Sequence, residues 1–217
     1  MKLTLLIISL FTFSLSNAQI KKGNLFIGGD VYLGFFNTTN TPNGDISRNS
    51  GFGFSPTIGW ATKDNLVVGV SILTNFSYNS YTNSDNYNSS SRIGAGVWMR
   101  KYLPIGKSFY LFGNGMFSVQ SLYNSNNIIA QSRFYKEEGC NINVILVPGI
   151  AYQVNKRLFL DASLNNLFTL GYERKNTEYQ NSGSSNNKQV ANSFILSSGI
   201  GGVTPLQVGM RWMITRN

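Results

Sequence analysis

The ionisable residues on strand-like segments are the first candidates for chemistry in this chain. Asp30, Arg92, Arg100, Asp161 and Arg211 each lie on the more polar side of a segment with alternating polarity. Charges confined to a narrow interior need partners, because burying an unpaired ion is costly. We therefore predict a structural salt-bridge cluster in which Asp161 holds Arg211 and Asp30 is a second partner. A gate or a ligand contact is the alternative function for these charges.

Composition limits the catalytic and metal-binding chemistry that the chain can perform. It contains no histidine, and Cys140 is its single cysteine. A histidine-assisted serine nucleophile and a His/Cys metal cluster therefore cannot be assembled. Glu137 and Glu138 form a carboxylate pair, but the polar sequence around them favours a solvated turn. We expect no enzymatic activity and no cofactor.

The overall composition is typical of a β protein rather than of an average soluble domain. Charged residues make up 12% of the 217 residues, compared with roughly 25% in soluble domains. Aromatic residues reach 13% and favour strands, whereas the many Asn, Gly and Ser residues favour turns. The length fits one domain. The formal net charge is +9, but Lys and Arg are scattered through turns and loops, so we expect no nucleic-acid partner. Anionic head groups of an outer leaflet are the alternative partner.

The amino terminus has the three parts of a secretory signal peptide. Lys2 supplies the positive charge, residues 3–15 are almost wholly apolar, and residues 16–18 offer small side chains for cleavage. A membrane-spanning helix needs about 20 residues, and this apolar stretch is shorter. We predict cleavage after Ala18, which divides the chain into a signal peptide, 1–18, and one mature domain, 19–217, that begins at Gln19.

Alternating polarity is the main structural signal in the mature chain. Eight segments each carry one apolar face and one face of small or polar residues, and each is longer than the usual 5–6 residues of soluble strands. The predicted strands are 25–36, 51–61, 66–78, 92–102, 108–121, 141–153, 158–167 and 204–214.

The connections between these segments alternate between short and long. The short ones are 62–65, 103–107 and 154–157, and the long ones are 37–50, 79–91, 122–139 and about 168–203. Within 168–203 two alternatives to a loop stay open: residues 171–172 extend the seventh strand, and residues 194–200 begin the eighth strand or form a separate short strand. This alternation is expected for short periplasmic turns and long extracellular loops. The sequence therefore predicts an all-β fold, an eight-stranded antiparallel up-and-down transmembrane β-barrel in the cell outer membrane.

Two stretches of sequence resemble the outer-membrane protein β-barrel domain family. They are RKYLPIGKSFYLFG at 100–113, and VPGIAY at 147–152 followed by LFLDAS at 158–163. The resemblance covers the whole mature chain and implies a small barrel related in shape to the OmpA/OmpX type. These motifs are fold signatures and identify no chemistry.

The last predicted strand is similar to the signal that the barrel-insertion machinery recognises. Gln207, Gly209, Trp212 and Ile214 match its polar, glycine, aromatic and hydrophobic positions. The chain departs from the usual form because it continues to Asn217 instead of ending on an aromatic residue.

The sequence leaves three functions open. The first is an integral outer-membrane barrel with a structural, adhesive or surface-receptor role through its extracellular loops. We expect its lumen to be largely filled, because eight strands enclose little more than their own side chains. Such a protein would contact outer-membrane lipids and lipopolysaccharide. We expect a monomer, and an extracellular ligand of unknown identity is a further partner that the sequence leaves open. The alternatives are a narrow channel for small solutes and a secreted lipocalin-like binding barrel.

Overall fold

The computed structural model describes residues 20–40, 45–81, 84–128, 133–164, 167–181, 187–198 and 206–215. The predicted signal peptide, 1–18, and the predicted mature start, Gln19, lie outside these ranges. Within them the secondary structure consists of strands, and none of it is a helix long and apolar enough to span a membrane.

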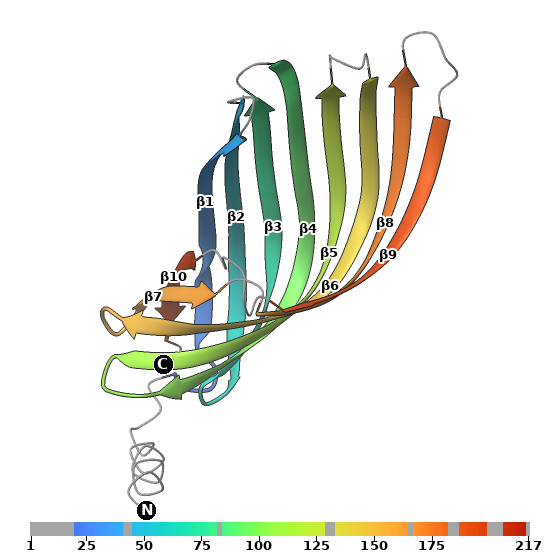
Figure 1. The fold of residues 1–217 in the computed structure, drawn as a ribbon. Coiled ribbons are helices and arrows are strands. Elements are labelled where there is room, and N and C mark those ends of the chain that lie inside the picture. The colour runs from blue at the N-terminus through green and yellow to red at the C-terminus, as the bar shows by residue number, and fades with distance from the viewer. Residues whose placement is uncertain are drawn as a thin grey trace, which may run out of the picture.

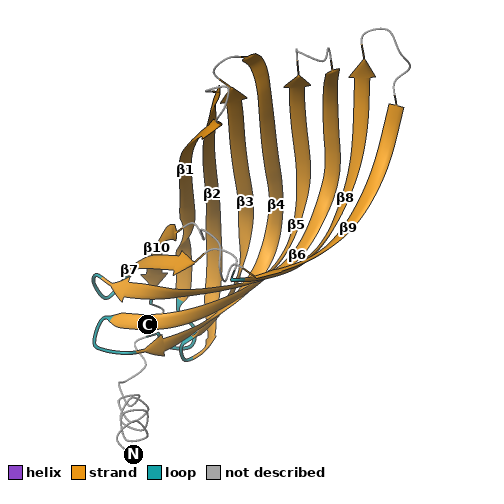
Figure 2. Cartoon of the chain, in the orientation of Figure 1, coloured by secondary structure: helices purple, strands orange, loops and turns teal. Residues whose placement is uncertain are grey.

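Ten antiparallel strands form one sheet (Figures 1 and 2). They are β1 (Leu25–Asn40), β2 (Asp45–Lys63), β3 (Leu66–Tyr81), β4 (Ser84–Pro104), β5 (Phe109–Ile128), β6 (Arg133–Gln153), β7 (Leu158–Leu164), β8 (Phe168–Asn181), β9 (Asn187–Ser198) and β10 (Leu206–Ile214).

The pairing of these strands makes the sheet ring-like at one end. Consecutive strands pair from β1 to β7, then β7 pairs with β10 and β10 returns to β1. The strands β8 and β9 extend the sheet from the opposite end of β6, where β8 pairs with Arg133–Leu146. We call the end that carries the connections 64–65, 105–108 and 154–157 the turn end, and the opposite end the hairpin end.

Two predictions about the strands are wrong. The described residues form ten strands instead of the eight predicted, and the predicted loop 168–203 contains β8 and β9. The other predicted loops are also mostly strand: β1 and β2, for example, continue to Asn40 and from Asp45. These Asn- and Ser-rich segments are polar on both faces, so alternation cannot reveal them, although their backbone groups pair in regular ladders.

The predicted seventh strand, 158–167, corresponds to β7, which ends at Leu164, and a change of register separates β7 from β8. On β6, Gly149 pairs with Ser163, whereas Leu146 pairs with Phe168. A step of three residues on β6 therefore corresponds to a step of five residues from β7 to β8. This mismatch interrupts the ladder as a bulge does. The consequence is that β7 closes the ring at the turn end while β8 starts a separate ladder.

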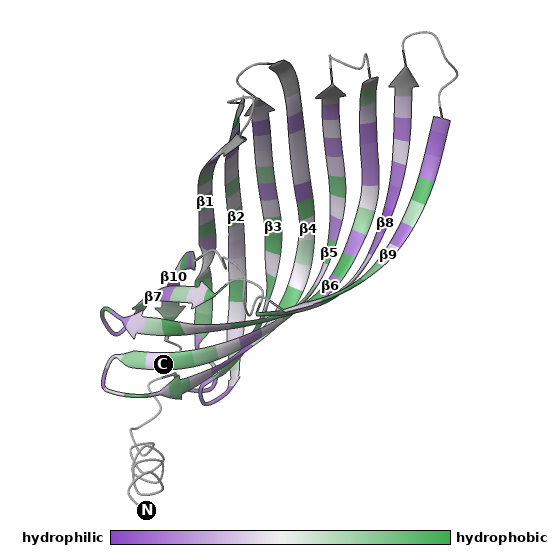
Figure 3. Cartoon of the chain, in the orientation of Figure 1, coloured by the Kyte–Doolittle hydropathy of each residue, from purple (hydrophilic) through white to green (hydrophobic). Residues whose placement is uncertain are grey.

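Hydrophobic and hydrophilic residues follow one another in bands along the strands (Figure 3), and their exposure shows that the two faces differ as the alternation predicts. We expected six residues to face outward: Phe54, Val70, Leu111, Leu146 and Leu160 are exposed, and Ile58 is half-buried. The opposite face holds buried polar residues, among them Ser71 and Ser118. The apolar surface therefore points away from the interior, which is the reverse of a soluble barrel.

The turn between β2 and β3 shows why this end is compact. Asn65 has a φ of 60°, a left-handed conformation that Asn tolerates better than most residues. Its backbone N–H donates to the carbonyl of Ile20, and its own carbonyl accepts from the N–H of Tyr102. The turn thus ties the segment before β1 to β4.

Candidate functional site: a charged layer, an aromatic seal and an open vestibule

Four of the five predicted charges meet in one layer inside the ring. Arg211 on β10 donates from Nη2 to both carboxylate oxygens of Asp30 on β1, at 3.0 and 2.9 Å. Its Nη1 contacts the Oδ2 of Asp161 on β7. Asp30 and Asp161 each lie opposite Gly209 in the ladders, so both flank Arg211 diagonally from the two neighbouring strands.

Arg100 completes this layer from across the lumen. It lies on β4, which does not pair with β7, and its Nη1 donates to the Oδ2 of Asp161 at 2.5 Å. The guanidinium also lies 4.0 Å from the centre of the Phe112 ring, a favourable cation–π distance. We call Asp30, Arg100, Asp161 and Arg211 the charged layer; its two acids balance its two bases.

The arrangement agrees with part of the predicted cluster. Asp161 and Arg211 are brought together, and Asp30 binds Arg211 directly despite lying further along its strand. The fifth residue, Arg92, is exposed and stands toward the hairpin end, opposite Asn75 and Leu122. It belongs to the wall of the vestibule described below and is not part of the charged layer.

A layer of aromatic rings lies next to the charged layer on the turn-end side. Tyr102 and Phe159 lie two residues from the ion-pair positions on their strands, and Phe26 lies four residues from Asp30 on β1. All three rings are almost completely buried. Ring centroids are 5.8 Å apart for Phe26 and Phe159 and 6.0 Å for Tyr102 and Phe112. Tyr110 adds a further ring, and its hydroxyl donates to the Oε1 of Gln153 at 3.1 Å.

Other apolar residues pack around these rings and complete what we call the aromatic seal. Ile20 is fully buried, although it precedes the first strand, and it packs in the same cluster as Met213. The seal consists of Ile20, Phe26, Tyr102, Tyr110, Phe112, Phe159 and Met213. Sequence reasoning did not single these residues out. The signal that could have found them is bulky aromatic side chains on an otherwise small, polar face, each close to a short turn.

A polar cavity of about 580 Å³ opens beyond the charged layer toward the hairpin end. We call this cavity the vestibule. Its lining is rich in amide and hydroxyl side chains and includes Tyr32, Asn49, Asn75, Ser77, Arg92, Gln120, Asn141, Asn143, Glu173 and Lys175. Asn141 Nδ2 donates to Glu173 Oε2 at 3.2 Å, and Lys175 pairs with the same carboxylate at 2.9 Å.

Only a small space continues from the vestibule toward the seal. It measures about 60 Å³ and is lined by Asp30, Arg100 and Arg211 among others. The vestibule and this small space share Asp30, Ser55 and Gln207 in their linings. The charged layer is therefore the floor of the vestibule.

Glu137 and Glu138 lie in strand β6, so the expected solvated turn at this pair is wrong. Glu137 Oε2 accepts from Asn124 at 2.9 Å across the ladder. Further out, Lys188 on β9 donates to Glu178 on β8, and this exposed hydrogen bond holds the pKa of Glu178 below its ordinary value. Within the described residues, no group of acidic or cysteine side chains has the arrangement of a metal site.

The residues of the predicted insertion signal alternate across β10. Gln207 lines the vestibule, and Gly209 provides the space in which Asp30 and Arg211 meet, because a Cβ at this position would overlap the Asp30 carboxylate. Trp212 and Ile214 point outward and are exposed. Recognition by the insertion machinery stays a prediction.

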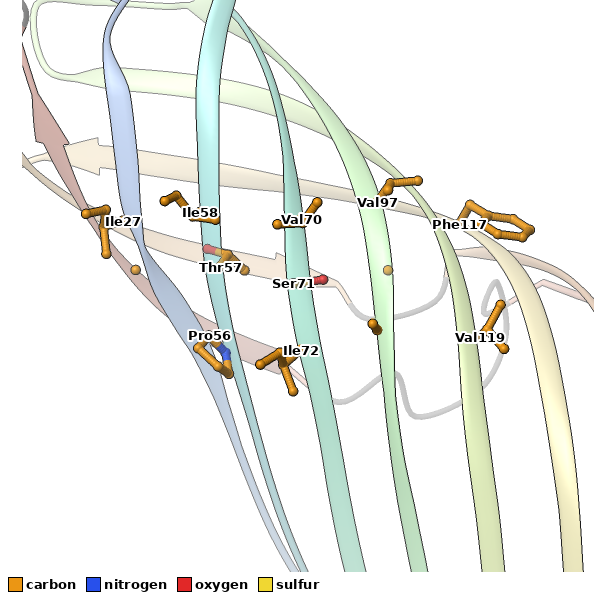
Figure 4. A pocket seen from close by; sticks show the side chains of 13 residues that line it. Ile27, Pro56, Thr57, Ile58, Val70, Ser71, Ile72, Val97, Phe117 and Val119 are labelled. Carbon is orange, nitrogen blue, oxygen red and sulfur yellow. The ribbon is translucent and has the colours of Figure 1, made fainter.

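The outward face of β1 to β5 carries a second hollow, of about 640 Å³ (Figure 4). Ile27, Ile58, Val70, Val97 and Phe117 line it, and its surface is almost wholly apolar. The hollow can accommodate apolar groups, but its lining offers few hydrogen-bonding groups to a polar ligand.

Comparison with solved structures adds an independent observation. The outer-membrane protein OprG from Pseudomonas aeruginosa superimposes with a TM-score of 0.52 over 92% of this chain and 100% of its own, at 12% identity. The chain has the fold of an outer-membrane protein. At this identity the likeness concerns the fold alone.

Two autotransporter domains match less well. The translocator domain of NalP from Neisseria meningitidis has a TM-score of 0.34 at 11% identity, covering 95% of this chain and 91% of its own. The β domain of the Bordetella autotransporter BrkA has a TM-score of 0.30 at 9% identity, covering 90% and 100%. No family model and no curated protein matches the sequence.

Proposed function

We propose that this protein is an integral outer-membrane β-barrel that acts at the cell surface and does not form an open pore. The ring-like sheet is the membrane-spanning part, the turn end faces the periplasm, and the vestibule opens to the exterior. Short connections at the turn end and long hairpins at the other end support this orientation.

The exposed apolar side chains support a membrane location over a soluble binding barrel. Aliphatic and aromatic side chains such as Leu33, Phe54, Val97 and Leu146 are between 45% and 63% exposed on the outward face. A lipocalin-like barrel would direct such residues inward and would surround them with a charged exterior. The secreted lipocalin-like alternative is therefore disfavoured.

The aromatic seal carries the proposal of a closed lumen. Below the charged layer, the rings of Phe26, Tyr102 and Phe159 pack with centroid separations between 5.8 and 6.4 Å, which leaves no room for a solute between them. A lumen closed on the periplasmic side and open on the other suits a surface receptor or adhesin, whose ligand need not cross the membrane.

A narrow channel is the second candidate function. The vestibule and the small space beneath it share part of their lining, so the charged layer and the seal are the barriers along one continuous axis. A rearrangement of these two layers would join the vestibule to the periplasm.

Conductance across planar bilayers distinguishes the two functions. We expect no conductance steps from the wild-type protein, and steps from a Tyr102→Ala/Phe159→Ala variant, because that change removes two rings from the seal. Phe109→Ala is the matched control, since Phe109 is an outward-facing aromatic residue at the same end. Steps from the wild-type protein, or from Asp161→Ala with the seal intact, would favour the channel.

A further inference from the structure

Basic side chains gather around the turn end, and far fewer acidic residues accompany them there than at the hairpin end. They lie before β1, at the end of β2, near the end of β4, and in the connections that follow β4 and β6. All are exposed: Lys21, Lys22, Lys63, Lys101, Lys107, Lys156 and Arg157. We call these residues the basic rim.

Acidic residues do not offset this charge. In the segments 20–24, 62–65, 104–108 and 154–157 the sequence contains a single acid, Asp64. Its Oδ1 accepts from the backbone N–H of Lys22 at 3.0 Å, and its carbonyl accepts from the ammonium of Lys101 at 3.4 Å. Much of the +9 net charge therefore stands at one end.

The backbone holds the segments of the rim in fixed positions. The N–H of Gly23 donates to the carbonyl of Ala61 at 2.8 Å, and the N–H of Met213 donates to the carbonyl of Arg157 at 2.6 Å. The carbonyl of Ile20 accepts from Asn65 at 3.0 Å. The rim is thus a preformed ring of cations and needs no ordering of a loop before it binds.

Outward-facing aromatic residues stand directly beside the rim. Trp60 lies three residues before Lys63, and Trp212 pairs with Leu158, the neighbour of Arg157. Both indole side chains are exposed, at 50% and 45%. Tryptophan is enriched at membrane–water interfaces, and a lysine next to such a belt can place its ammonium group among the lipid head groups.

From this placement we propose that the basic rim binds the phosphate head groups of anionic phospholipids in the periplasmic leaflet. The inference rests on the proposed membrane location and orientation. The attraction of a ring of cations to an anionic surface increases with the number of cations, and salt screens it beyond about a Debye length. The expected ligand is therefore a lipid in direct contact with the rim.

The two outward tryptophans make the test possible without an added label. We would reconstitute the mature protein into vesicles that contain either brominated phosphatidylcholine or brominated phosphatidylglycerol at equal mole fraction, and measure quenching of tryptophan fluorescence. Trp98 is buried inside the ring and supplies the unquenched background. We expect phosphatidylglycerol to associate about fivefold more strongly or better, the ratio that one cation near an anionic surface provides.

Two neutralised variants separate the rim from the rest of the surface. In the first, Lys63, Lys156 and Arg157 are each changed to Gln, and the preference for phosphatidylglycerol should fall close to unity. In the matched control, three exposed cations toward the hairpin end, Arg48, Arg174 and Lys188, are changed to Gln, and the preference should remain. Sodium chloride at high concentration should reduce the wild-type preference.

The outcomes distinguish this inference from the proposed function. Quenching by phosphatidylcholine with no preference for phosphatidylglycerol would leave the protein in the membrane and overturn the lipid-binding rim. A preference that survives in the rim variant would also overturn it. If neither brominated lipid quenches the outward tryptophans, the protein does not insert, and the proposed function fails together with the inference.

Discussion

Replacing Asp161 with asparagine should destabilise the protein strongly, because it removes charge from the centre of the charged layer and keeps the side-chain volume. The Oδ2 atom of Asp161 receives contacts from both Arg100 and Arg211, and the three side chains are between 2% and 5% exposed. With Asp161 neutral, two buried guanidinium groups share only Asp30. Breaking a buried ion pair in this way costs about 3–5 kcal/mol of unfolding free energy.

A double-mutant cycle tests whether that cost comes from the pair itself. Asp161→Ala and Arg211→Ala should each be destabilising, whereas the double variant retains one acid and one base in the layer. We expect the double variant to be more stable than the sum of the single losses predicts, with a coupling energy of about 1–3 kcal/mol. The measurement is the free energy of unfolding from urea titration of protein refolded in detergent micelles.

The exposed pair of Glu178 and Lys188 provides the control for this cycle. Its atoms are as close as those of the interior pairs, at 2.8 Å, but water screens the charges. Glu178→Gln should therefore leave the unfolding free energy unchanged within error. A coupling energy near zero between Asp161 and Arg211, or an unchanged stability of Asp161→Asn, would refute the structural role of the charged layer.

Three further predictions concern the outward face, the interior packing and the amino terminus. Val70→Arg should destabilise the lipid-inserted protein by about 2–4 kcal/mol, whereas Ser55→Arg in the vestibule wall should be tolerated. Equal losses of stability for the two variants, measured by refolding into vesicles, would contradict the assignment of outward and inward faces. Gly59→Ala places a Cβ 2.6 Å from the Trp98 ring, and this overpacking should lower the free energy of unfolding by about 1–3 kcal/mol in the urea titration. Gly113→Ala is the control, because its Cβ meets no atom within 4 Å, and it should leave the stability unchanged. Mass spectrometry of the membrane fraction should find the chain cleaved at the predicted signal-peptide site; an uncleaved chain would refute the cleavage, and a chain free in the medium would refute the membrane location.

Local sequence determined the fold class and the sidedness of the strands. Period-two alternation in segments such as 51–61 and 66–78 is a local property, because successive side chains of a strand point to opposite faces. The same alternation placed Asp161 and Arg211 on the interior face. The short connections were also predictable, since 62–65 and 154–157 are brief and polar between two long alternating runs.

Where the strands are polar on both faces, as in 37–40 and 45–50, the sequence carried no such signal. In the stretch 168–203 the alternation is brief: β8 exposes Phe168, Leu170 and Tyr172, and β9 exposes Phe194 and Leu196. The full length of these two strands depends on hydrogen bonds to neighbouring strands. The register shift that separates β7 from β8 depends on how both align with β6, which no local pattern specifies.

The partners within the interior were decided by tertiary structure. Arg100 reaches Asp161 across the lumen from a strand that does not pair with β7, so no strand-neighbour argument predicts this contact. The aromatic seal and the basic rim likewise join residues far apart in the chain. Alternation fixes which face a side chain occupies, but only closure of the sheet determines which side chains from distant strands lie at the same height and therefore touch.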